Sequence, residues 1–533
     1  MDSKKEQASW SRVGMGLVFL LFFFGSLILV NPASLYVSPD ETANAYFAGS
    51  FADSGEIQGS YDDLVSDFDR IHPRSTVSID GRLLPGSFLG LPFLYGMFEF
   101  LLGSWVLWIL TPLLTMLTAY GWGRLIRRFT NPTLGTISTI LFLIHPAVWY
   151  YSARGLMHNV LFLDLLVLSL WFWVDRPWMN RQKRPSVWND LLGGLCLGLA
   201  LFVRTSEIMW VGAGVVLAGI IWWRTLSWRR VRAGVFGFAL GIGLLLFMNG
   251  MTYGNPFTTG YTVGAPALTE LVQGETTDAI QLLPFGFHPM NAWRHFASYG
   301  VSMFWWLSLL AVPGFFLLLA QTPHQRTIRW SVGLAVVVSL WLVLMYGSWE
   351  IHDNPDPTQI TMANSYVRYW LPMYLFSTPM IAFTIQWVAS RGRSGFARTA
   401  IVLTLLLVVI GMNVQATFLQ GQDGLMKMRQ ELDRASAIQE SVLRYTEGGS
   451  VIIVDRADKL FFPHRHVWYP LRDEATYEAM PALVEATTLY YYGITFPEED
   501  MAYLNESRLK RMDLQIELIE TYDQESLYRI TTP

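Results

Sequence analysis

Two adjacent carboxylates stand at the edge of the first long apolar stretch of the chain. Asp40 and Glu41 belong to the run Ser38-Pro39-Asp40-Glu41, and they follow an apolar segment at 13–31 that is long enough to cross a bilayer. Charged groups so near a membrane are costly to desolvate and usually serve a function. A carboxylate there can accept a proton from a reacting hydroxyl while one reactant is held in lipid and another in water. The pair therefore indicates an enzyme rather than a simple anchor.

The same four residues also fit the start of a helix. Ser38 can cap the helix, Pro39 suits its first position and Glu41 completes a capping box. Taken alone, the run favours the cap over catalysis. Adjacent helical side chains point in different directions, so Glu41 can serve the cap while Asp40 faces elsewhere. The two interpretations are compatible.

The composition is that of a membrane protein. Of the 533 residues 52% are hydrophobic and 15% are charged, whereas a soluble chain carries about 25% charged residues. No basic tract indicates nucleic acid as a partner. The single cysteine, Cys196, excludes a disulfide framework and a thiolate metal cluster. The first apolar segment lacks a small-residue cleavage site, which disfavours a signal peptide.

Eleven apolar stretches predict a polytopic bundle that is mainly α-helical. They lie at 13–31, 104–123, 134–151, 157–174, 188–203, 207–223, 233–250, 299–320, 330–347, 369–388 and 399–416. Segment 87–103 is apolar but interrupted, and it is expected to be an interfacial or re-entrant helix. Lys and Arg cluster before the first span and after every second span, which places the N-terminus in the cytoplasm and the C-terminus outside.

The organisation predicted from these spans has two domains. Residues 1–416 form a transmembrane domain whose first extracytoplasmic loop, 32–86, carries the acidic pair. Residues 417–533 form a small soluble extracytoplasmic α/β domain, with strands at 450–455 and 489–492 and a hairpin of 514–521 with 526–532. Helices are expected near 425–446, 473–486 and 498–512.

This order of features resembles the C-type (GT-C) integral membrane glycosyltransferases. The resemblance is greatest to family 39, the protein O-mannosyltransferase and aminoarabinose-transferase-like branch, and it covers roughly residues 10–420. Asp40-Glu41 carries it most specifically. Weaker matches are Ser152-Ala153-Arg154, Arg204, Asn249 with Gly254-Asn255-Pro256, and Arg368-Tyr369-Trp370-Leu371-Pro372. The resemblance implies a polyprenyl-phosphate-linked sugar as donor, with Asp40 and Glu41 catalytic and Asn249 and Tyr369 binding substrate.

One departure from the family pattern concerns the second acid. Many relatives carry an acid a few residues after the arginine that follows the third span, but here His158 and Asn159 stand in that stretch. The nearest acid, Asp164, lies deeper in the next span. His158 is either a neutral hydrogen-bond partner of the substrate or a satisfied polar residue at a helix end.

An inverting transfer needs one base and a stabilised leaving group. A lipid phosphate leaves without an acid, but it needs cations, and Arg offers a bidentate fork. The candidates on the predicted outer side are Arg74, Arg82, Arg154, Arg204, Arg294 and Arg368. Arg204 and Arg368 are favoured because they lie at span ends, although snorkelling explains them too. Arg74 and Arg82 come next, with a solvated loop charge as their alternative.

No cofactor is expected. The loop His352-Asp353-Asn354-Pro355-Asp356 leaves a divalent metal as an alternative, but it shows no sharp ligand spacing.

The sequence therefore predicts an inverting glycosyltransferase of the cell envelope, in the plasma (inner) membrane. Its partners are membrane lipids, the lipid-linked donor and an acceptor that is a glycan, lipid or protein. A lipid or solute transporter is the first rival, but most acids lie outside the predicted spans. A non-catalytic membrane scaffold is the second, and it gives no reason for Asp40 and several arginines to share one side.

Overall fold

The computed structural model describes residues 2–60, 68–174, 187–263, 283–322, 324–351, 353 and 359–533. The chain divides into two compact units. The first, here called the helical unit, comprises Met1–Leu29, Trp108–Phe247 and Pro266–Met428. The second, here called the sheet unit, comprises Val30–Leu107, Met248–Ala265 and Arg429–Pro533. The acidic loop is thus grouped with the C-terminal sheet, and not with the apolar helices.

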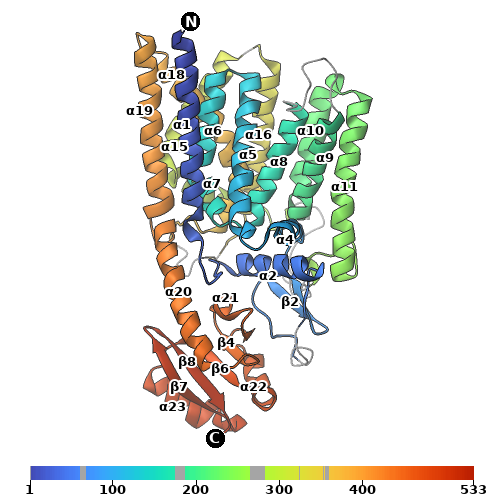
Figure 1. The fold of residues 1–533 in the computed structure, drawn as a ribbon, viewed down its shortest axis with the longest axis vertical. Coiled ribbons are helices and arrows are strands. Elements are labelled where there is room, and N and C mark those ends of the chain that lie inside the picture. Colours follow the sequence, from blue (N-terminus) through green and yellow to red (C-terminus); the bar gives the residue numbers. More distant parts are fainter. Residues whose placement is uncertain are drawn as a thin grey trace. The chain divides into compact units, whose positions relative to one another are not determined.

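The helical unit is built from long apolar helices, and most of them run side by side (Figure 1). Among its closely packed pairs are α8 with α9, α15 with α18 and α6 with α18. Its described helices are α1 (Asp2–Ser26), α5 (Val106–Phe129), α6 (Pro132–Ile144), α7 (Pro146–Ala153), α8 (His158–Val174), α9 (Val187–Val203), α10 (Ile208–Trp222), α11 (Trp228–Tyr253), α14 (Pro289–His295), α15 (Trp305–Gln321), α16 (Arg326–Gly347), α17 (Ser365–Tyr369), α18 (Leu371–Ala389) and α19 (Gly395–Val414).

Every apolar stretch predicted to be a span coincides with a helix or with two consecutive ones. By length and composition, five described helices can cross a bilayer, or up to seven if each of two bent pairs counts as one span. The helices at the predicted places are confirmed, and the number of eleven spans stays a prediction.

The sheet unit contains a five-stranded mixed sheet of order β5-β4-β6-β8-β7. Strands β4 (Val451–Val454), β5 (His466–Trp468) and β6 (Leu489–Ile494) are parallel. Strands β7 (Gln515–Tyr522) and β8 (Glu525–Thr531) form the predicted hairpin. The predicted strands are confirmed, but β5 was missed, because only three residues between Pro463 and Pro470 form it.

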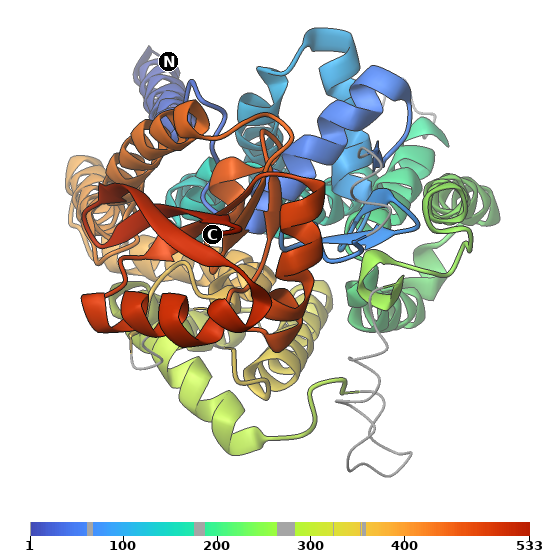
Figure 2. The ribbon, with the colours of Figure 1, turned by 90° about the horizontal axis from the view of Figure 1, so that it is seen from below.

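Helices cover both faces of this sheet (Figure 2). Helix α20 (Leu425–Tyr445) lies over one face, where the Tyr490 hydroxyl donates to the carbonyl of Tyr445. Helix α22 (Glu474–Ala486) packs Met480 and Leu483 against the other face, beside Tyr491. The predicted helices near 425–446 and 473–486 are confirmed. The prediction near 498–512 corresponds to α23 (Glu498–Tyr503) followed by two short turns.

The first loop forms a second part of the sheet unit. It contains α2 (Pro39–Ser54), strands β1 (Gly59–Ser60), β2 (Thr76–Ile79) and β3 (Arg82–Pro85), and α4 (Gly90–Leu102). Strands β2 and β3 form a two-residue hairpin at Asp80-Gly81, whose positive φ angles of 49° and 73° suit the mirror-image turns of hairpins. Ile71 is fully buried in the core of the C-terminal sheet. The loop and the C-terminal residues therefore share one hydrophobic core.

Helices α9 and α11 approach each other through glycines. A Cβ on Gly194 would lie 1.9 Å from the carbonyl oxygen of Gly234, and one on Gly237 would lie 2.0 Å from that of Leu191. Small residues allow such close contact of helix backbones in lipid. Because α9 ends immediately before Arg204, this packing fixes the helix end from which that side chain extends.

We expect Gly237→Ala to force α11 away from α9 and to lower stability by about 1–3 kcal/mol, the usual cost of overpacking. Gly243→Ala on the same helix is the matched control, because a Cβ there meets nothing within 4 Å. Thermal unfolding of the purified protein in detergent compares them. Equal midpoints for the two variants would show that the close helix contact does not matter for stability.

Candidate active site

The acidic pair begins helix α2, as the sequence predicts. Ser38 is the N-cap, and its Oγ accepts a hydrogen bond from the Glu41 backbone N–H at 3.4 Å. The same hydroxyl donates to Glu41 Oε2 at 2.7 Å, and Pro39 occupies the first helical position. Glu41 is only 2% exposed. The cap is confirmed, and it engages Glu41 rather than Asp40.

Asp40 points to a different partner. The Ser75 hydroxyl donates to Asp40 Oδ1 at 2.5 Å, and the Asp40 side chain stays partly exposed. Ser75 has a φ of 65°, which is uncommon for a residue with a side chain. Its carbonyl accepts from Gly86 N at 3.0 Å, which ties this bend to the end of the β2–β3 hairpin. The carboxylate is therefore oriented by a residue 35 positions away in the chain.

The residue before Ser75 anchors this bend to the C-terminal part of the sheet unit. Arg74 donates through Nε and Nη2 to Asp458 Oδ1, at 2.9 and 2.6 Å, and through its backbone N–H to Oδ2 at 2.9 Å. Nη2 also reaches the carbonyl of Arg456 at 2.7 Å. The Asp458 side chain is completely buried. Arg74 was predicted to bind a phosphate. In the structure its guanidinium forms an ion pair with Asp458.

The other predicted residues of the sheet unit take separate positions. Arg82 is exposed at the start of β3, next to the hairpin turn. Asn249 is buried, and its Nδ2 donates to the carbonyl of Pro256 at 3.2 Å. It thereby closes the turn that follows α11.

In the helical unit, Arg204 lies in a buried polar cluster. Its Nη2 lies 2.6 Å from Glu207 Oε1 and 3.1 Å from the Tyr346 hydroxyl. Trp210 Nε1 also donates to Glu207. The carboxylate balances the charge of the buried guanidinium, which would otherwise be very costly in an apolar setting.

Arg368 meets Arg204 at one aromatic ring. The guanidinium carbons lie 5.1 Å (Arg204) and 5.4 Å (Arg368) from the centroid of the Tyr369 ring. Both distances are within the range of cation–π contacts. Arg368 also contacts Met157 Sδ at 3.4 Å, and Asn159 Nδ2 donates to the Arg368 carbonyl. The neighbours of His158 on both sides therefore touch Arg368. The structure brings together three of the predicted residues, Arg204, Arg368 and Tyr369, and places the two chain neighbours of His158 against Arg368.

Several residues of these clusters escaped prediction. Ser75 and Asp458 help to position Asp40, although they lie 35 and 418 residues away in the chain. No local sequence pattern identifies either of them. Glu207 offered a signal, since an acid three residues after an arginine at a helix end is a natural partner. Asp164 is 1% exposed and accepts a hydrogen bond from Thr115 at 2.9 Å, so it is held inside the helices.

The metal hypothesis concerns a loop that falls largely outside the described residues. His352, Asn354, Pro355 and Asp356 are not described. Asp353 accepts from the backbone N–H of Ser365 at 2.7 Å, at the start of α17. Within the described part of the chain, no group of three or more His, Cys, Asp or Glu side chains is placed to hold a metal ion.

Comparison with known proteins gives matches among solved structures alone. No family model and no curated protein matches the chain. The structure of ArnT from Cupriavidus metallidurans, bound to undecaprenyl phosphate, is similar with a TM-score of 0.53, at 11% identity over 98% of both chains. The oligosaccharyltransferase AglB from Archaeoglobus fulgidus, in complex with an inhibitory peptide and a dolichol-phosphate, is similar with a TM-score of 0.52, at 10% identity over 91% of this chain and 69% of that chain.

Both neighbours are GT-C glycosyltransferases, the superfold that the sequence resembles. At identities this low the likeness shows the fold alone, and this chain has the GT-C fold. The helices that are long and apolar enough to cross a bilayer are those of an integral membrane protein.

We expect Arg74→Met to destabilise the sheet unit, because it leaves the buried Asp458 carboxylate without its cation. Breaking a buried pair costs about 3–5 kcal/mol, and the lower end applies because the Arg74 side chain is 33% exposed. Arg70→Met is the matched control. It breaks the exposed pair with Asp473 on the same loop, and such pairs contribute little.

Thermal unfolding and limited proteolysis at the first loop measure both variants. A lower midpoint and faster cleavage are expected in Arg74→Met alone. The same stability in the two variants would contradict the anchoring role of the buried pair.

Proposed function

We propose that this protein is an inverting glycosyltransferase that moves a sugar from a polyprenyl-phosphate donor to an acceptor hydroxyl. The observation that carries the proposal is the partly exposed Asp40 carboxylate, oriented by Ser75 at the start of a capped helix in a chain with the GT-C fold. The lipid phosphates bound by ArnT and AglB support a lipid-linked donor.

Asp40 is the proposed base. Its carboxylate accepts the proton of the acceptor hydroxyl while the acceptor oxygen bonds to the anomeric carbon. The bond from that carbon to the phosphate oxygen breaks on the opposite face, and the electron pair leaves with the polyprenyl phosphate. One displacement inverts the anomeric centre, so one positioned base suffices. Glu41 is proposed to support this site by holding the helix start in place.

Arginines are proposed to stabilise the leaving phosphate. Arg204 and Arg368 come first, because both guanidinium groups lie within cation–π distance of the Tyr369 ring. Glu207 balances one of these charges, which allows the pair to stay close before a ligand binds. Tyr369 and His158 would contact the donor in the same region. Arg74, Arg82 and Asn249 are weaker proposals, since described contacts give Arg74 and Asn249 structural roles.

The proposed setting is the extracytoplasmic face of the plasma (inner) membrane. The alternating Lys and Arg loops support a cytoplasmic N-terminus and an extracytoplasmic C-terminus. The acceptor class is left as a glycan, lipid or protein. The proposed chemistry uses no cofactor.

Replacing Asp40 tests the proposed base. We expect Asp40→Asn to lower sugar transfer at least about 100-fold, the scale of losing a general base, with unchanged thermal stability. Asp53→Asn is the matched control, because Asp53 is an exposed acid on the same helix. Transfer is followed in proteoliposomes with a panel of polyprenyl-phosphate sugars. Activity of Asp40→Asn close to that of wild type would refute the assignment, and solute flux without transfer on any donor would favour a transporter.

Arg368→Lys tests the proposed phosphate site. Lysine keeps the charge but loses the fork, so the KM for the donor should rise about tenfold or more. The matched control is Arg444→Lys, because Arg444 forms an exposed pair with Glu440. An unchanged KM for the donor in Arg368→Lys, with an intact fold, would remove Arg368 from the phosphate site.

A further inference from the structure

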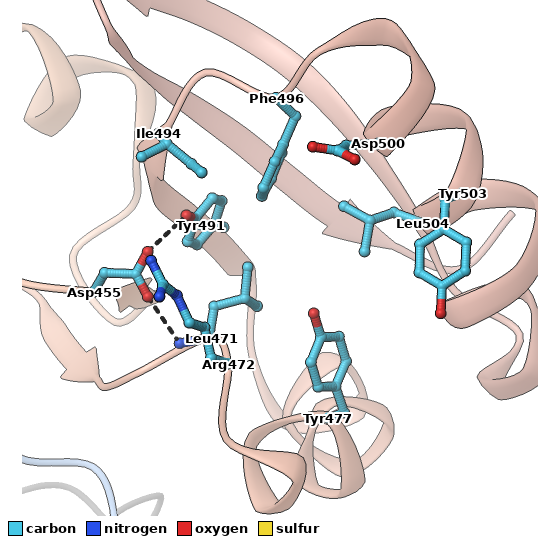
Figure 3. A pocket seen from close by; sticks show the side chains of 10 residues that line it. All are labelled: Asp455, Leu471, Arg472, Tyr477, Tyr491, Ile494, Phe496, Asp500, Tyr503 and Leu504. Atoms are coloured by element: carbon cyan, nitrogen blue, oxygen red, sulfur yellow. Dashed lines mark hydrogen bonds between the residues drawn. The ribbon is translucent and has the colours of Figure 1, made fainter.

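A cavity of about 170 Å³ opens in the sheet unit, and aromatic, aliphatic and charged side chains line it (Figure 3). The proposed transfer chemistry uses none of its residues. Ten residues line it: Asp455, Leu471, Arg472, Tyr477, Tyr491, Ile494, Phe496, Asp500, Tyr503 and Leu504.

The topology of the sheet explains why a cavity forms here. The chain runs from β4 to its neighbour β5, and then crosses to β6 on the other side of β4. Asp455 directly follows β4, Leu471 follows β5 closely, and Ile494 ends β6. The cavity thus lies at the carboxyl ends of three parallel strands, at the point where the strand order reverses. This is where open α/β sheets bind their ligands.

The lining combines aromatic rings with polar groups. Tyr491 and Phe496 stack with ring centroids 5.2 Å apart and an interplanar angle of 17°. Tyr477 from α22 and Tyr503 from α23 add two more rings, and Tyr503 is 59% exposed. Tyr503 offers exposed aromatic surface, Tyr491 is buried, and the Arg508 guanidinium carbon lies 4.4 Å from the centroid of the Tyr477 ring.

The acid at the base of the cavity is held in place. The Tyr491 hydroxyl donates to Asp455 Oδ2 at 3.0 Å, and Leu471 N donates to Oδ1 at 3.3 Å. Figure 3 shows Asp500 near Phe496, and Arg472 on the same side as Asp455. A fixed carboxylate, a second carboxylate and a guanidinium therefore border the same rings.

The size and charge of the cavity limit its ligand. It is smaller than the roughly 300–1,000 Å³ of sites for drug-sized molecules, so it accepts one small group. Two carboxylates against one arginine disfavour an anion such as a phosphate or a uronic acid. A lipid tail would cover the charged side chains of Asp500 and Arg472 without replacing their contacts with water. A neutral sugar ring suits both the aromatic rings and the charged side chains of the cavity. Its C–H face packs on an aromatic ring, and its hydroxyls form hydrogen bonds with carboxylate and guanidinium groups.

We propose that this cavity binds one neutral sugar unit of a glycan. Asp455 and Arg472 would hold its hydroxyls, and Tyr503 and Tyr477 would pack on its ring. The proposal is independent of the transfer chemistry, because it is tested by binding alone.

Saturation-transfer NMR on the full-length protein tests this, with neutral monosaccharides and short neutral glycans as probes. The protein is held in a detergent without a sugar headgroup, because a maltoside would compete. Wild type should show saturation transfer to at least one neutral sugar, and uronic acids and sugar phosphates should show less. Tyr503→Ala and Asp500→Asn should each weaken the binding about fivefold or more without lowering the thermal midpoint, since both residues are exposed.

Tyr445→Ala is the matched control, because Tyr445 is an exposed tyrosine of the same unit outside the cavity. Three results would overturn the proposal. One is saturation transfer to no neutral sugar. Another is equal binding by wild type, Tyr503→Ala and Asp500→Asn, which would place the bound sugar elsewhere on the protein. Binding of an aromatic peptide at the cavity in place of every sugar would also reject it.

Discussion

The ion pair of Arg74 and Asp458 is the interaction on which the sheet unit depends. Asp458 is completely buried, and a buried carboxylate needs a cation and further hydrogen bonds. Arg74 supplies the side-chain donors and a backbone N–H to the same group. Ser75 comes next in the chain, and its hydroxyl orients Asp40. The pair thus fixes the bend from which the proposed base receives its geometry.

The features that could be predicted from the sequence are those set by residues close together in the chain. The Ser38 cap depends on four consecutive residues, and the sequence indicated both the cap and the separation of Glu41 from Asp40. Apolar stretches likewise placed the helices, since about 20 apolar residues leave few alternatives. The hairpin of β7 and β8 was visible because its strands adjoin one turn. The three-residue strand β5 was not, because its partner β4 decides its conformation.

Contacts between segments far apart in the chain could not be predicted from the sequence. Arg74 and Asp458 are 384 positions apart, and each looks like an ordinary surface charge in its own neighbourhood. The sequence therefore did not reveal that Arg74 contacts Asp458, and its phosphate role stays a prediction. The cluster at Tyr369 shows the opposite case. Arg204 and Arg368 were chosen as span-end charges, and the structure brings both to one ring, which supports their shared role.

The central claim is that Asp40 removes the proton of the acceptor. The most direct test is the rate of single-turnover sugar transfer by Asp40→Ala, measured with and without added formate. Formate can enter the space left by the missing side chain and act as a base. The account predicts a rate near background without formate and a partial recovery with it, alongside no effect of formate on wild type. Transfer by Asp40→Ala at the wild-type rate without formate would contradict it.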